Sequence, residues 1–144
     1  MKYIVTLSLA ILLFACEKIS YYELAINNTT EHEIRIEAFF KQNELEVINI
    51  PANDIYTRSV SKEKNEDIPI IFSTSLIDSV NIIFDSVKII IQNCDQSVLE
   101  YCPDVYRNIL RLYDEYEKEI KGKDSYYYTY TITEEDYNNA VPIE

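Results

Sequence analysis

The chain has 144 residues and a formal net charge of −12 at pH 7, with 13 lysines and arginines against 25 acidic residues. Nucleic-acid binding needs clustered basic side chains to neutralise phosphates, so this balance argues against a nucleic-acid partner. The length suits a single domain with its own hydrophobic core, and we expect a monomer. The negative charge also predicts that an anionic lipid surface repels the domain.

The N-terminal stretch MKYIVTLSLAILLFAC has the pattern of an export signal that ends in a cysteine. Lys2 precedes an uncharged run over residues 4–14, which is shorter than the roughly 20 apolar residues of a spanning helix. Residues 13–16 (LFAC) resemble the bacterial lipobox, whose cysteine receives a diacylglycerol. The resemblance implies that residues 1–15 are a lipoprotein signal peptide and that Cys16 is lipidated. An ordinary secretory signal and a buried N-terminal strand are the alternatives.

This resemblance also implies where the protein resides. Residues 16–20 would form a short lipidated tether, and residues 21–144 would form one domain held at a membrane by the acyl chains on Cys16. We expect a cell-envelope protein on the outer membrane, with the leaflet left open.

Two further cysteines, Cys94 and Cys102, form an even pair in an exported chain and favour a disulfide bond. Closing this short loop would stabilise the fold by roughly 2–3 kcal/mol on the chain-entropy model. Two free thiols are the alternative. Zinc fits poorly, because a structural zinc site takes four Cys or His ligands and the one histidine, His32, is distant in sequence.

Alternation of apolar and polar residues predicts a mainly β fold. Residues 34–40 give the clearest case, with isoleucines on one face and charged residues on the other. Turns rich in Asn and Asp separate the strands, since the chain has a single glycine. We therefore predict an antiparallel β-sandwich, with an immunoglobulin-like arrangement as one candidate. The other predicted strands cover residues 22–26, 45–50, 55–60, 68–72, 80–84, 87–91 and 125–133.

An Asp-Ser pair at residues 85–86 lies between two apolar runs and predicts a β-hairpin. A two-residue turn would place Ile89 and Ile91 on the core face and leave Ile83 and Ile90 on the opposite face. We expect a second layer to cover the latter two, because an exposed apolar patch promotes aggregation.

Two helices are predicted toward the C-terminus. Apolar residues over residues 103–121 recur near a period of 3.6, with Pro103 suited to the first turn and Gly122 to the C-cap. An extended segment beginning at Tyr116 is the alternative. Residues 133–136 (TEED) resemble a capping box and predict a short C-terminal helix.

No residue pattern predicts catalysis, a cofactor or a metal site, and His32 is expected to be a surface residue of a turn. Tyr126, Tyr127 and Tyr128 must alternate between the two faces of a strand, so at least one ring should be exposed for ligand contact. Such rings stack on sugars or anchor protein partners, although core packing also accounts for them.

The lipobox, SVNIIFD at residues 79–85 and TYTITEEDYNNA at residues 129–140 together resemble small uncharacterised envelope lipoproteins of Bacteroidota. The resemblance implies no catalytic residues. We therefore expect a lipid-anchored envelope protein that is not an enzyme and that binds or scaffolds through protein–protein contacts. The alternative is a glycan-binding surface module that uses exposed tyrosines.

Overall fold

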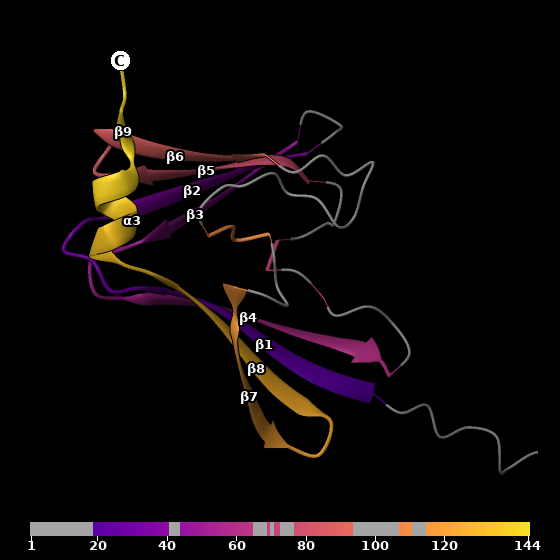
Figure 1. Ribbon diagram of the computed structural model, residues 1–144. Coiled ribbons are helices and arrows are strands. Elements are labelled where there is room, and N and C mark those ends of the chain that lie inside the picture. Colours follow the sequence, from indigo (N-terminus) through magenta and orange to yellow (C-terminus); the bar gives the residue numbers. More distant parts are fainter. Residues whose placement is uncertain are drawn as a thin grey trace, which may run out of the picture.

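The computed structural model describes residues 19–40, 44–64, 69, 71–72, 77–93, 107–110 and 115–144. Two β-sheets face each other and diverge with distance from helix α3 (Figure 1), so the predicted mainly β sandwich is confirmed. One sheet has the strand order β4–β1–β8–β7, and the other has the order β3–β2–β5–β6–β9. The elements are β1 (Ile19–Asn28), β2 (Ile34–Phe40), β3 (Leu45–Ile50), β4 (Ile55–Glu63), β5 (Ile77–Phe84), β6 (Lys88–Asn93), β7 (Glu117–Gly122), β8 (Ser125–Ile132), α3 (Glu134–Asn139) and β9 (Val141–Pro142).

The first sheet is built around a pair of strands that are distant in sequence. β1 and β8 run parallel, which places Leu24 opposite Tyr128 and Ile26 opposite Tyr130 on the core face. The other strand pairs within the described residues are antiparallel. The strand order differs from the immunoglobulin arrangement, in which the first two strands share a sheet, because β1 and β2 here lie in different sheets.

The turn between β5 and β6 is one residue longer than predicted. Phe84 pairs with Lys88, so three residues connect the strands. Asp85 and Ser86 take positive φ angles of 48° and 59°, a conformation that Asp tolerates better than most residues. Because neighbouring residues of a strand point to opposite faces, one extra residue reverses the orientation of every side chain in β6.

The predicted faces of β6 are therefore wrong. Ile90 lies opposite Ile82 and packs against the core, whereas Ile89 lies opposite Ile83 on the outer face. Ile91 also points outward and is 54% exposed. The longer turn thus moves two isoleucines from the expected core onto the surface of the second sheet.

The helix predicted over residues 103–121 is wrong in its last part, where Glu117–Gly122 form strand β7 and pair with β8. The alternative of an extended segment is correct there. The main chain of this segment pairs with that of β8, and an extended strand can form such a pairing whereas a helix cannot. Residues 107–110 form a bend and a turn. The rest of the predicted helix lies outside the described residues.

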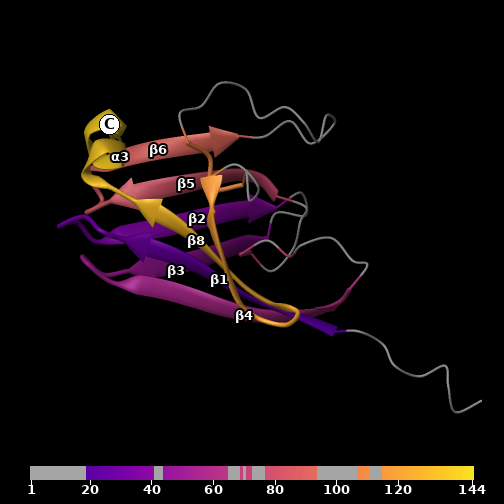
Figure 2. The ribbon, with the colours of Figure 1, turned by 60° about the horizontal axis from the view of Figure 1, so that its bottom comes forward.

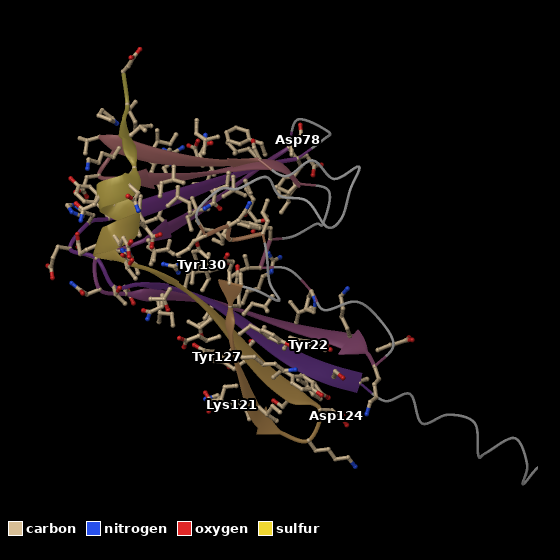
Figure 3. The ribbon with its side chains drawn as sticks, in the orientation of Figure 1. Tyr22, Asp78, Lys121, Asp124, Tyr127 and Tyr130 are labelled. Atoms are coloured by element: carbon tan, nitrogen blue, oxygen red, sulfur yellow. The ribbon has the colours of Figure 1, made fainter. Side chains whose placement is uncertain are left out.

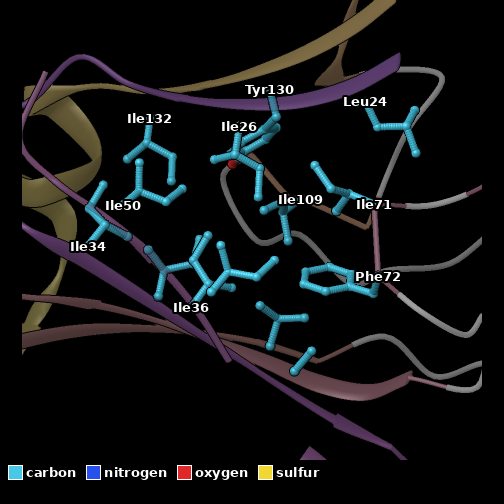
Figure 4. Packing of buried hydrophobic residues seen from close by; sticks show 14 of the residues in the cluster. Leu24, Ile26, Ile34, Ile36, Ile50, Ile71, Phe72, Ile109, Tyr130 and Ile132 are labelled. Atoms are coloured by element: carbon cyan, nitrogen blue, oxygen red, sulfur yellow. The ribbon is translucent and has the colours of Figure 1, made fainter. Parts of the chain in front are cut away.

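The core lies between the sheets and is dominated by isoleucine and tyrosine (Figure 4). Segments between the strands also contribute to it, because Ile71, Phe72 and Ile109 are at most 4% exposed. The described part of the predicted edge strand at residues 68–72 forms a bend rather than a strand. Its apolar character reflects burial at the centre of the sandwich.

The predicted C-terminal helix is confirmed as α3. The carboxylate of Asp136 accepts a hydrogen bond of 2.7 Å from the Thr133 amide, in the manner of a capping box. The same carboxylate pairs with the Arg107 guanidinium at 2.9 Å. Arg107 also donates to the Thr131 carbonyl, so α3 is fastened to β8 and to the segment between β6 and β7.

Asn28 joins the loops at the end of the sandwich next to α3. Its side chain is fully buried and donates to the carbonyls of His32 and Pro51, each at 2.8 Å. Its side-chain oxygen accepts the Thr30 amide at 3.0 Å. One amide group therefore satisfies main-chain atoms of both the β1–β2 loop and the β3–β4 turn.

We predict that Asn28→Ala lowers the free energy of unfolding by about 2–3 kcal/mol, because the buried main-chain partners lose their hydrogen bonds. Urea denaturation measures this change. Asn49→Ala, at an exposed position of β3, is the matched control and should change stability little. Equal effects of the two substitutions would contradict the role assigned to Asn28.

Candidate functional site

The structure separates the three tyrosines that the sequence singled out. Tyr128 is 3% exposed in the core, and Tyr126 stacks on Tyr22 with 5.5 Å between ring centroids. Tyr127 points to the outer face of the first sheet, where the Lys121 ammonium lies 5.1 Å from its ring centroid (Figure 3). Cys16, Cys94 and Cys102 lie outside the described residues.

A hollow lies on the outer face of the first sheet beside Tyr127. Its volume is about 350 Å³, and its lining combines hydroxyl, carboxylate and ammonium groups with one exposed aromatic ring. Tyr127 borders it through its pairing with Glu23. Hydroxyl-rich surfaces next to aromatic rings suit sugars. The hollow is lined by Tyr21, Tyr22, Glu23, Ser59, Val60, Ser61, Lys121, Ser125 and Tyr126.

An apolar surface lies on the outer face of the second sheet. Val141 lies opposite Ile89, and Ile89 lies opposite Ile83, so these three side chains form a row across β9, β6 and β5. Ile91 extends the row along β6. Val141 and Ile91 are 58% and 54% exposed. We call these four residues, Ile83, Ile89, Ile91 and Val141, the isoleucine face.

The border of the isoleucine face is acidic. Arg35 lies opposite Ile83, and its guanidinium is paired with the Glu37 carboxylate at 2.7 Å. Glu33 and Asp85 line an adjoining hollow together with Ile83. Arg35 is neutralised by Glu37, and Asp85 contacts His32. With Glu33 included, acidic groups outnumber lysines and arginines at this border.

The strand edge next to the isoleucine face is open in the described part of the chain. β9 pairs with β6 only at Lys88 and Ile89, so among the described residues no strand borders the main chain of residues 90–93 on that side. A sheet edge of this kind can accept a strand from another protein. The apolar face and the open edge together form a surface suited to an extended protein segment.

His32 joins three segments at the end of the sandwich near α3. Its Nδ1 lies 2.5 Å from the Asp85 carboxylate, and its ring stacks on Tyr137 with 3.6 Å between centroids. Its Nε2 lies 3.9 Å from the Glu134 carboxylate. The histidine expected to be a simple surface residue therefore links the β1–β2 loop, the β5–β6 turn and α3.

This contact changes the acidity of Asp85. The hydrogen bond with His32 is the largest effect and lowers the pKa of Asp85 below its ordinary value of 3.8. Burial opposes it, and the hydrogen bond from the Glu33 amide lowers the pKa by a smaller amount. The ionised carboxylate is thus the form that the fold favours. It accepts the Glu33 amide at 2.9 Å, which holds the turn against the preceding loop.

Two buried tyrosines near the centre of the fold are structural. Burial raises the pKa of Tyr130 to about 12 and raises that of Tyr116 well above its usual range. The Tyr116 hydroxyl donates to the Ile109 carbonyl at 2.9 Å, and the Ile109 amide donates to Gln92 at 2.9 Å. These bonds connect β6 to the first sheet through the described segment at residues 107–110.

Within the described ranges, no three His, Cys, Asp or Glu side chains gather in a way that would hold a metal ion. The described helical residues form no apolar segment of sufficient length to cross a membrane. No protein-family model matches the chain, and neither a curated protein nor a solved structure matches it. Its function therefore has to be inferred from the chemistry of its own surfaces.

We predict that Asp85 contributes to stability above pH 3.8 and that this contribution is lost as the pH falls through its lowered native pKa. Asp85→Asn should remove that part of the acid dependence. Urea midpoints measured across the acidic range test this, with Asp78→Asn at an exposed position as control. An acid profile of Asp85→Asn identical to that of the unchanged chain would refute it.

Proposed function

We propose that the protein is a lipid-anchored cell-envelope protein that acts by binding another envelope protein and not by catalysis. The observation that carries this proposal is the isoleucine face. Ile91 and Val141 expose more than half of their surface, at 54% and 58%, beside a strand edge that no other described strand covers at residues 90–93. Contiguous outward apolar side chains in a chain of net charge −12 are characteristic of a contact surface.

The charges around the isoleucine face define the partner. Glu33 and Asp85 border it, and Arg35 is already paired with Glu37. A second copy of this chain would bring like charges together, so we propose a different protein. Its contact segment would be extended and apolar, with lysine or arginine at its border, and it would add a strand to the open edge of β6.

The lipid anchor rests on the lipobox-like residues 13–16. One acyl chain binds a membrane only marginally, whereas two or three hold a protein durably. We further propose that Cys94 and Cys102 form a disulfide bond, as expected of an exported pair. Peptide mass spectrometry of the protein purified from membranes tests both assignments, through the mass added to Cys16 and through a linked Cys94–Cys102 peptide.

The hollow beside Tyr21 and Tyr127 supports a second candidate, the binding of a glycan. An exposed aromatic ring lies there next to serine hydroxyls and a carboxylate. The two candidates use opposite sheets. They therefore predict opposite effects of substitutions on the two outer faces.

We predict that Ile91→Asp weakens partner binding at least tenfold, because an unpaired carboxylate buried at the contact costs more than about 1.4 kcal/mol. Thr57→Asp adds the same charge at an exposed position of the first sheet and should leave binding unchanged. Binding is measured as the amount of partner protein that each variant captures from detergent-solubilised envelopes. Because salt screens the basic side chains at the border of the partner, added salt should release the captured partner.

Equal capture by the unchanged chain and by Ile91→Asp would reject the isoleucine face as the contact. If Tyr127→Ala abolished retention on envelope polysaccharide while Ile91→Asp did not alter capture, the glycan function would replace the proposed one. We expect that Ile91→Asp no longer captures the partner and that Tyr127→Ala still does.

A further inference from the structure

Strand β9 is held to the second sheet by a small number of contacts. It pairs with β6 at two positions, and the Ile143 amide donates to the Val87 carbonyl at 2.9 Å. Pro142, the second residue of β9, has no amide hydrogen to donate. Val141 and Ile143 are 58% and 44% exposed, so burial of their side chains stabilises this attachment little.

Helix α3, which precedes β9, is attached more firmly. Asp136 is 4% exposed and pairs with Arg107 at 2.9 Å. Tyr137 packs against the core and stacks on His32. Ala140 is 7% exposed, and its amide donates to the Asp136 carbonyl at 3.0 Å. Because segments with few buried contacts open at a low cost in free energy, β9 can separate from β6 while α3 stays in place.

β9 and the end of α3 shorten the part of the β6 edge that another strand can reach. α3 lies beside the start of β6 (Figure 2). Val141 lies opposite Ile89, so Ala140 is level with Ile90, and its amide is already bonded within α3. An added strand could therefore pair with residues 91–93 without meeting either element. Strands usually have about five or six residues, so a strand of ordinary length needs the whole of β6, and β9 has to leave.

We propose that β9 is a displaceable strand that protects the edge of β6 until a strand of the partner takes its place. This inference rests on the proposed function, because it concerns the same edge and the same partner. In the free protein, β9 covers part of an edge that would otherwise favour pairing with other chains. Binding requires molecules in which β9 is released, so the apparent affinity is reduced by the fraction of such molecules.

The exchange of strands also specifies one residue of the partner. In the free protein, Val141 lies opposite Ile89 on the outer face. In the complex, an apolar side chain of the partner takes the place of Val141. Ile83, Ile89 and Ile91 belong to β5 and β6 and remain where they are, so most of the isoleucine face is kept.

The first test measures whether β9 opens without α3. Amide hydrogen exchange of the intact protein, purified from membranes in detergent, is followed by NMR spectroscopy, and each rate is compared with that of an unstructured peptide. Protection of the Ile143 amide should be about tenfold or more below that of the Ala140 amide. Equal protection of the two amides would mean that β9 and α3 open together, and would overturn the inference.

The second test releases β9 by substitution. Ile143→Pro removes the amide that bonds to Val87, at an exposed position, and Ala140 should keep its protection. At limiting amounts of protein, this variant should capture about threefold more partner from detergent-solubilised envelopes, because β9 is released in more molecules. Ile143→Ala keeps the amide and is the matched control, which should capture as much partner as the unchanged chain.

Unchanged or lower capture by Ile143→Pro would overturn the displacement of β9. The isoleucine face would still stand as the contact if Ile91→Asp lost the partner in the same experiment. If Ile91→Asp captured as much partner as the unchanged chain, the proposed contact and this inference would both be rejected.

Discussion

The three-residue turn between β5 and β6 determines which side chains of β6 reach the core and which face solvent. Asp85 secures this turn by bonding to His32 and to the Glu33 amide, so the loop before β2 fixes the register of a hairpin far along the chain. With one residue fewer, Ile89 and Ile91 would be buried, and Ile90 would face outward in their place. The proposed contact surface exists because of that register.

The parallel pairing of β1 with β8 determines how the molecule is oriented. It aligns the start of β1 with the β7–β8 turn, and the end of β1 with the residues that lead into α3. The start of β1, the end nearest to the proposed anchor, therefore lies beside the β7–β8 turn, while Asn28, His32 and α3 lie at the other end (Figure 1). Contact with a membrane and contact with a protein can thus use separate surfaces.

The sequence predicts local features well, because strand alternation and helix capping depend on neighbouring residues. Strand β2 and the Thr133–Asp136 capping box are examples. Register and strand partners depend on distant residues. Local patterns therefore predict neither which face of β6 is buried nor the parallel pairing of β1 with β8. Residues 117–121 fit both a helical and an alternating pattern, and only pairing with β8 decides between them. The isoleucine face was missed for the same reason.

The most direct test of the central claim is site-specific photo-crosslinking in intact cells, with a photoreactive residue at position 91 or at position 57. These positions are exposed on the outer faces of opposite sheets. A discrete protein adduct is expected from position 91 and none from position 57. An adduct confined to position 57, or none from either position, would contradict the claim that the isoleucine face binds an envelope protein.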